Sequence, residues 1–493
     1  MYLYSSPPRP LLMALIQQAD ERYAYARLAA DIESLVRAGT LEPGARLPSV
    51  RRMSAQRGVS LPTVLQAYRL LETRRVIRAR PQSGFYVLPP SRPNLIEARG
   101  AETLADPGEV TTGDLIMRVL EMVANPALVP LGTALPEPDL LPTAELSRCL
   151  GRVARRQAGH RAAELAPSGV EALRQQVARR ALEAGCARTA DDVVITCGAA
   201  EAIHLALRAL TRPGDTVAVE SPAYFGTLQA IDALGLRALE IAMDPRTGIR
   251  LDLLAEALRR GGVRAVVVTP NVHNPLGCIM PDENKAELVR LLAQSGVPAI
   301  EDDTYGELHF AEPRPRSLQA FDRSGLVISC GSFSKTVAPS YRVGWMVPGR
   351  YRDRVLHLKL ATTAATSAPP QLALAEYLAS GGYDRHLHRL RAVLRGTVER
   401  FAFEVAERFP AGTRISQPAG GFLLWVQLPE GSDTVDLQRR ALKRGLSVAP
   451  GPAFSASGDF ADCLRINAGY RWSDGTREAL DLLAGLIRTS GCG

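Results

Sequence analysis

A single lysine, Lys335, ends the segment 329–335, Ser-Cys-Gly-Ser-Phe-Ser-Lys, and Arg342 lies seven positions later. An amine on a flexible stem can form an imine with a carbonyl group. The hydroxyls of Ser332 and Ser334 can donate to phosphate oxygens, and a guanidinium pairs with phosphate through two parallel hydrogen bonds. We therefore hypothesise a site for a phosphorylated aldehyde, and pyridoxal 5'-phosphate (PLP) carries both groups. Taken alone, this short motif is equally consistent with a solvated loop.

Two further segments provide groups for a phosphate and an aromatic ring. Gly198 follows a β-prone run and opens a helix, so its amide and those of Ala199 and Ala200 can hold a phosphate at the positive end of the helix dipole. A simple glycine turn explains this segment equally well. Tyr224 follows a Ser-Pro turn, from which its ring can lie flat against a pyridine ring.

Three polar side chains complete this hypothetical site. Asn274 precedes Pro275, which holds it out of the helical region and would fix its amide toward the phenolic oxygen of a pyridoxal. Asp302 ends an apolar run and can pair with a protonated pyridine nitrogen, while Tyr305 can donate to the same phenolic oxygen. Adjacent acids are usually only solvated, but these terminate a hydrophobic run.

Short β-prone runs alternate with helical patterns from residue 191 onward. The runs cover residues 193–196, 216–219, 265–269, 299–301 and 326–329. This rhythm predicts an α/β large domain with a parallel sheet and helices on both faces. Sites in such folds lie beyond the carboxyl ends of the strands, and each segment above directly follows one of these runs.

The chain beyond about residue 350 is expected to form a smaller α+β lobe. Two short strand patterns over residues 413–429 are split by Gly420 and Gly421. Arg465 stands in the middle of another predicted strand, between apolar neighbours. A charge in that position needs a partner.

The positive charge of the chain is confined to its first fifth. The formal net charge is +8, and residues 1–92 contain 14 arginines, no lysine and six acidic residues. The rest of the chain is therefore neutral overall. A compact basic module joined to a neutral body predicts a polyanionic partner for the module alone.

The basic module shows the pattern of a winged helix-turn-helix. Apolar residues at helical spacing predict a helix over 25–38, a second over 48–57 and a third that Ser60 caps, and the run 76–88 predicts a hairpin. The third helix would lie in the major groove of double-stranded DNA. Residues expected to contact the DNA are Ser60 and Thr63 near the start of that helix, and Arg51, Arg52 and Arg80 toward the phosphates and the adjacent groove.

Composition and spacing bound the remaining possibilities. With 493 residues, 46% hydrophobic and 22% charged, the chain is typical of a soluble globular protein of about three domains or lobes. Its apolar runs are too short to span a membrane and no signal peptide pattern is present, so we expect a cytoplasmic protein with no membrane partner. The seven cysteines lack the spacing of a zinc site, so we expect no metal.

The predicted domain order is a DNA-binding domain over residues 1–88, a linker over 89–126 and a PLP-binding body over 127–493. Proline and small polar residues recur in the linker, which predicts an extended segment between two independently placed bodies. Residues 114–123 form a short amphipathic pattern that we expect to pack on the body.

Two resemblances sharpen these hypotheses. Residues 44–87, with LPSVRRMSAQRGVSLPTVLQAYRLLE and then ARPQSGFYV, resemble the winged helix of GntR-type bacterial repressors, which implies that Arg51 and the start of the recognition helix contact DNA. This chain has Leu61-Pro62 where many relatives carry polar residues. The motifs from Gly198 to Arg465 occur in the order and spacing of the fold type I aminotransferases.

The second resemblance implies a role for each motif. It implies Lys335 as the Schiff-base lysine and Asp302 as the partner of the pyridine nitrogen. The remaining implied contacts are Asn274 and Tyr305 on the ring oxygen, Ser332, Ser334 and Arg342 on the phosphate, and Arg465 on the carboxylate of a substrate. One departure is the pair Ala199-Ala200, where relatives often carry polar side chains that help to hold the phosphate.

A GntR-type winged helix followed by an aminotransferase-like body resembles the MocR subgroup of bacterial transcription regulators. The resemblance implies a head-to-tail homodimer that binds a DNA operator, uses PLP and senses an amino acid or amine effector. A working class I or II aminotransferase with a DNA-binding appendage is the main alternative. A body that only dimerises is the third, and the intact ring and phosphate motifs disfavour it.

Overall fold

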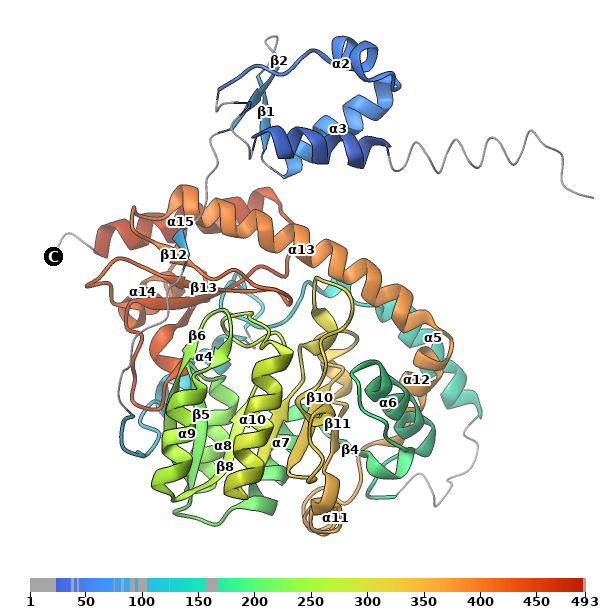
Figure 1. The fold of residues 1–493 in the computed structure, drawn as a ribbon, viewed down its shortest axis with the longest axis vertical. Helices are drawn as coiled ribbons and strands as arrows, with labels where there is room; N and C mark the ends of the chain where they lie inside the picture. The colour runs from blue at the N-terminus through green and yellow to red at the C-terminus, as the bar shows by residue number, and fades with distance from the viewer. Residues whose placement is uncertain are drawn as a thin grey trace, which may run out of the picture. The chain divides into compact units, whose positions relative to one another are not determined.

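The computed structural model of the chain describes residues 24–36, 40–41, 44–74, 76–80, 84–88, 94–95, 104–123, 125–156 and 166–490. The chain divides into two compact units, Met1–Arg92 and Pro93–Gly493 (Figure 1). Each unit has its own core of buried apolar side chains. In the part of the chain that is described, no helix is both long and apolar enough to cross a membrane.

The small unit contains a helix-turn-helix followed by a hairpin. A helix over residues 24–36 precedes α2 (Val50–Arg57) and α3 (Leu61–Thr73), and β1 (Ile77–Arg80) pairs antiparallel with β2 (Gly84–Val87). The predicted winged helix-turn-helix fold is therefore confirmed.

Local sequence sets the ends of α2 and α3. The Oγ of Ser49 accepts a hydrogen bond from the amide of Arg52 at the start of α2. Gly58 ends α2 with φ of 63°, a left-handed conformation that glycine adopts without a Cβ penalty. Ser60 then caps α3, since its Oγ accepts from the amide of Thr63. The two helices are thus joined by a three-residue turn.

The large unit is built on a central sheet with the strand order β4-β11-β10-β9-β8-β5-β6-β7. Its strands are β4 (Val194–Thr196), β5 (Thr216–Ser221), β6 (Arg237–Asp244), β7 (Gly248–Ile249), β8 (Val263–Val268), β9 (Ala299–Asp302), β10 (Val327–Ser332) and β11 (Gly344–Val347).

The sheet is mixed, which corrects the expected parallel sheet. The strands from β10 through β9, β8 and β5 to β6 are parallel, but β11 runs antiparallel to both β10 and β4, and β7 runs antiparallel to β6. The connection from β10 to β11 over residues 333–343 holds only a single 3-10 turn. A parallel return needs a crossover of a dozen or more residues, so this connection gives an antiparallel strand.

Helices cover both faces of the sheet, as the sequence predicts (Figure 1). Alternate residues of β5 point to opposite faces: Val217 and Val219 pack in one core and Ala218 in the other. The first core includes α4 (Gly113–Val123), α7 (Gly198–Leu210), α8 (Phe225–Ala233) and α11 (Arg352–Leu360), and the second includes α9 (Leu251–Arg260) and α10 (Asp282–Ser295).

A second sheet and three helices form the smaller lobe. The sheet has the order β14-β15-β13-β12-β3, with β3 (Asn94–Leu95), β12 (Arg414–Ile415), β13 (Leu423–Gln427), β14 (Ala449–Pro450) and β15 (Cys463–Asn467). It packs with α13 (Gly382–Arg408), α14 (Thr434–Leu442) and α15 (Asp474–Ser490), and the same core reaches α5 (Thr143–Arg156), α6 (Glu171–Glu183) and α12 (Ala368–Ala379).

The described part of the expected linker packs on the large unit, which departs from an extended segment. The amide and carbonyl of Gly108 exchange hydrogen bonds with Ala238 of β6 at 2.9 and 2.8 Å. Four residues further on, the hydroxyl of Thr112 donates to the carbonyl of Ser455 at 2.8 Å. Residues 107–112 are therefore fastened to both lobes of the large unit.

Candidate functional site

A cavity of about 280 Å³ lies at the carboxyl ends of the central strands. Each sequence motif contributes to its wall because each follows a strand that ends there. The predicted residues on the wall are Ala199, Ala200, Tyr224, Asn274, Asp302, Tyr305, Ser332, Ser334, Lys335 and Arg342. Gly198 and Arg465 lie directly behind it, in contact with Arg342 and Asn274 respectively.

Lys335 reaches into this cavity without a carboxylate in direct contact. Its Nζ donates to the carbonyl of Ala134 at 2.7 Å and lies 5.7 Å from the centre of the Tyr305 ring. Burial and then the positive charge of Arg465 lower the pKa of the Lys335 amine to about 7, although Asp302 opposes this shift. A lowered pKa favours the neutral, nucleophilic form of this amine at neutral pH.

Hydroxyls and a guanidinium gather at one end of the cavity. The Oγ of Ser332 donates to the Oγ of Ser334 at 2.9 Å, and Arg342 Nη1 donates to the same Ser334 oxygen at 3.4 Å. These donors converge beside the first turn of α7, which begins without a side-chain cap. Because the first amides of a helix attract anions, this end of the cavity suits a phosphate.

Two glycines make the close approach at this end possible. Gly198 has φ of 80°, and a Cβ on it would lie 2.7 Å from Arg342 Nη2. A Cβ on Gly344 of β11 would lie 2.5 Å from the carbonyl carbon of Gly198. Any larger side chain at either position would displace the guanidinium or the start of α7.

A buried hydroxyl without a partner and a buried carboxyl group also line the cavity. The Oη of Tyr305 is buried and has no hydrogen-bond partner among the described residues. It would gain from a polar ligand, since an unpaired buried polar atom costs about 1–3 kcal/mol. Asp302 accepts from the amide of Thr304 at 3.0 Å, and burial raises the pKa of its carboxyl group.

Arg465 is fully buried in β15 and forms no ion pair with a described carboxylate. Its Nη1 donates to Asn274 Oδ1 at 3.2 Å and its Nη2 to the carbonyl of Gly132 at 2.8 Å, while its Nε has no partner among the described residues. Burial lowers the pKa of this guanidinium. The guanidinium lies over the rings of Phe225 and Phe454, and a buried cation with no carboxylate partner suits the binding of an anion.

Some residues of the site give no signal in the sequence. Leu120 comes from α4, and Ile203, Gln229 and Thr269 come from positions that read as ordinary helix or strand. Glu201, one turn into α7, accepts from Lys359 Nζ and from the amide of Cys197. Its spacing after Gly198 could have indicated a side chain that supports the helix start.

The expected DNA-contacting residues differ in exposure. Arg51, Arg52 and Ser60 are exposed, whereas the side chain of Arg80 lies outside the described residues. Thr63 is only 5% exposed, and its Oγ1 lies 2.7 Å from the Oγ of Ser60. We therefore correct its assignment, because a buried hydroxyl engaged in the helix cap cannot reach a base. Leu61 is 46% exposed at the start of α3.

Comparisons with known proteins assign both units. Residues 139–481 match the family of class I and II aminotransferases, and residues 24–87 match the gntR family of bacterial regulatory proteins. The chain therefore belongs to the class I and II aminotransferase family in its large unit and to the gntR family in its small unit. This combination is that of the MocR-type transcription regulators.

Relatives with the same combination extend over nearly the whole chain. The chain is 38% identical over 461 residues to the uncharacterized HTH-type transcriptional regulator YjiR of Escherichia coli, covering 92% of this chain and 97% of that protein. It is 29% identical to the 2-aminoadipate transaminase of Thermus thermophilus, covering 76% and 93%.

The solved structures show the same fold in the large unit. The alpha-aminoadipate aminotransferase LysN of Thermus thermophilus, in complex with N-(5'-phosphopyridoxyl)-L-leucine, aligns with a TM-score of 0.70 and 29% identity. The alignment covers 76% of this chain and 95% of that one.

The family implies PLP as cofactor, and the cavity fits it. A phosphate suits the glycine-lined start of α7 with Ser334 and Arg342, where a Cβ would block the approach. An aromatic ring with a phenolic oxygen suits the partnerless Tyr305 hydroxyl, and Lys335 lies within reach of an aldehyde between them. Neither alanine at 199 nor alanine at 200 adds a side-chain donor, so the backbone amides would serve there.

We predict that Lys335 is the most reactive lysine of the chain at neutral pH. The chain has four lysines: Lys335, the fully buried Lys285 and Lys359, and the exposed Lys443. Trinitrobenzenesulfonate labelling of cofactor-free protein, read by peptide mass spectrometry, should show Lys335 modification with a midpoint near pH 7.

Arg465→Met provides the matched control for this prediction. Because Arg465 is the second cause of the lowered pKa, its loss should move the Lys335 midpoint to higher pH. An unchanged midpoint in this variant, or a Lys335 midpoint near the ordinary lysine value of about 10 in the parent chain, would refute the electrostatic account.

Proposed function

We propose that this regulator holds PLP covalently through Lys335 and uses the loaded cavity to sense an amino acid or amine. The observation that carries the proposal is the convergence of a nucleophilic lysine, an anion cradle and unpaired buried donors in one cavity. PLP, when bound, supplies an aldehyde that attaches to amines and a pyridine ring that withdraws electrons from them.

Each residue of the site would contact a different part of the bound PLP or of the amino compound. Asp302 would carry the negative charge beside the ring nitrogen, and the phosphate cradle would fix the other end of the ring. Arg465, with its unpaired Nε, would bind the carboxylate of an amino acid. Lys335, whose pKa is about 7, is suited to accept and return a proton at neutral pH.

The small unit would bind the DNA operator. The exposed arginines at the start of α2 would contact phosphates, and the exposed start of α3 would lie in the major groove. The exposed Leu61 side chain suits the methyl group of a thymine. A homodimer, which we propose to be head-to-tail, would place two such units on two half-sites, and occupancy of the cavity would favour one spacing.

Turnover as an aminotransferase is the second candidate. It is supported by a lysine suited to proton transfer and a nearby buried arginine suited to binding a carboxylate, and by relatives named as aminotransferases. The two functions are distinguished by the fate of an added amino compound. A stable spectral change marks a sensor, whereas steady release of a keto acid marks an enzyme.

We predict that Lys335→Ala abolishes the visible absorbance of bound PLP. The variant cannot attach the aldehyde, but the loss of one side-chain stem leaves the dimer and the winged helix folded. Absorbance spectra of purified protein loaded with PLP test this, and size-exclusion chromatography checks the fold. Lys443→Ala is the matched control and should keep the absorbance. An unchanged spectrum for Lys335→Ala would remove that lysine from the proposal.

We predict that Arg51→Ala weakens operator binding and leaves PLP absorbance unchanged. Loss of one phosphate contact weakens binding about equally for all sequences and lowers the slope of log affinity against log salt by about 1 per arginine. Fluorescence anisotropy with operator DNA over a salt series measures both effects.

Arg27→Ala is the control for net charge. Arg27 is exposed on the first helix of the small unit, outside the helix-turn-helix. The two variants have equal charge, so a general effect of charge would weaken both equally. Equal losses in the two variants, or full affinity in Arg51→Ala, would contradict a contact by Arg51.

A further inference from the structure

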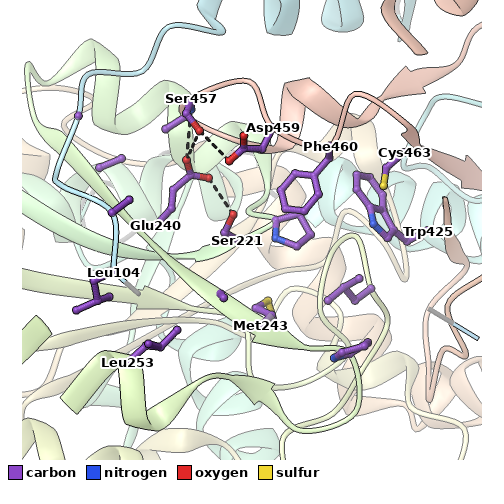
Figure 2. A pocket seen from close by; sticks show the side chains of 18 of the residues that line it. Leu104, Ser221, Glu240, Met243, Leu253, Trp425, Ser457, Asp459, Phe460 and Cys463 are labelled. Carbon is purple, nitrogen blue, oxygen red and sulfur yellow. Dashed lines mark hydrogen bonds between the residues drawn. The ribbon is translucent and has the colours of Figure 1, made fainter. Parts of the chain in front are cut away.

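A second cavity lies in the large unit, away from Lys335. Its volume is about 280 Å³, equal to that of the cavity around the lysine, and the two share no lining residue. Three parts of the chain form its main walls: the segment 104–109, strand β6 of the central sheet, and β13 with the loop 456–460 of the smaller lobe (Figure 2). Ser221 at the end of β5, Leu253 of α9 and Leu276 also line it.

Most of the wall is apolar and buried. Trp425 and Phe460 contribute aromatic rings, whose centres are 5.9 Å apart, and Met243, Leu253 and Leu276 contribute aliphatic side chains. A cavity of this volume and lining suits an aromatic or branched aliphatic body of roughly the size of an amino acid side chain with its backbone.

The charged groups of the wall all have the same sign. The lining includes Asp106, Glu109, Glu240 and Asp459, and among the described lining residues there is no lysine, arginine or histidine. The neighbouring cation, Arg237 of β6, donates through Nη2 to the carbonyl of Pro107. The cavity therefore combines an apolar body site with an uncompensated negative rim.

Glu240 is the fixed member of this acidic group. Its Oε1 accepts from the hydroxyl of Ser221 at 3.1 Å, and its Oε2 accepts from the hydroxyls of Ser455 and Ser457, each at 3.1 Å. These neutral donors hold the carboxylate in place but do not neutralise it, and the dashed lines in Figure 2 mark the bonds from Ser221 and Ser457. Because a carboxylate oxygen has two lone pairs, Oε1 can accept a second hydrogen bond from a ligand.

We propose that this cavity binds a small organic cation, an amine with an aromatic or branched aliphatic body. The body would lie against Trp425 and Phe460, and the ammonium group would donate to Glu240. Charge complementarity and the aromatic lining select this class over anions and neutral compounds. The site is independent of PLP, so the inference stands apart from the function proposed above.

One wall of this cavity belongs to the segment that follows the DNA-binding unit in the sequence, so a bound ligand would affect that segment. The segment 104–109 forms one wall and is continuous with residues 107–112, which are bonded to β6 and to the loop at Ser455 and Ala456. A ligand that contacts all three walls would stabilise this attachment of the segment. It would thereby alter the chain that follows the DNA-binding unit.

Three indoles of similar shape and different charge test the proposal. Gramine is a tertiary amine, which cannot form an imine with PLP, and 3-isobutylindole and indole-3-acetate are its neutral and anionic counterparts. Isothermal titration calorimetry of the full-length, PLP-loaded protein should show binding of gramine, with both counterparts at least about tenfold weaker. Equal affinities for the three compounds, or no binding of gramine, would overturn the proposal.

Variants locate the binding. Glu240→Gln keeps the shape of the side chain but removes its negative charge, and should weaken gramine about tenfold without changing 3-isobutylindole. Ala105→Trp, at an exposed position of the segment, should fill the cavity and weaken both compounds while leaving the core intact. Lys335→Ala should bind gramine like the parent chain. Full gramine affinity in both cavity variants, or its loss in Lys335→Ala, would contradict this site.

Discussion

The chemistry of the large unit depends on one buried amine, that of Lys335, whose pKa burial lowers toward neutral pH. Lys335 lies at the ends of the central strands, where the nearby Arg465 adds to the effect of burial and lowers its pKa to about 7. An ordinary lysine would be charged and unreactive toward carbonyl groups at this pH. The buried strand β15 carries the Arg465 guanidinium, and the glycine pair Gly198 and Gly344 lets Arg342 approach the start of α7. The carboxyl group of Asp302 acts in the opposite direction and limits the lowering of the Lys335 pKa.

Two units with separate cores divide recognition of DNA from recognition of a small molecule. The excess positive charge of the sequence lies within residues 1–92, in the unit that folds as a winged helix. Because the large unit has no net charge, it would bind its ligands through local contacts and not through long-range electrostatic attraction. Residues 107–112 belong to the large unit through their bonds to β6 and to the loop at Ser455 and Ala456, so the segment that follows the DNA-binding unit is itself part of the ligand-binding body.

The sequence predicted the winged helix correctly, and the residues predicted to contact the ring and the phosphate line one cavity, because the signals for both are local. Ser60 caps a helix, Gly58 ends one, and each motif of the large unit directly follows a strand. Prediction from the sequence failed where the outcome depends on tertiary contacts. The sequence predicted a parallel sheet, but β11 returns antiparallel beside β10. The segment 104–112 has no apolar period although it packs on two lobes, and the polar side chain of Thr63 is buried. The partnerless atoms of Tyr305 and Arg465 are visible only in three dimensions.

The most direct test of the central claim is to locate the covalent bond. PLP-loaded protein would be reduced with sodium borohydride, which makes an imine permanent, then digested and mapped by peptide mass spectrometry. The account predicts a phosphopyridoxyl group on the peptide that contains Lys335 and on no peptide that contains Lys285, Lys359 or Lys443. A label on the exposed Lys443, or on no lysine, would contradict the assignment of the cavity as the cofactor site.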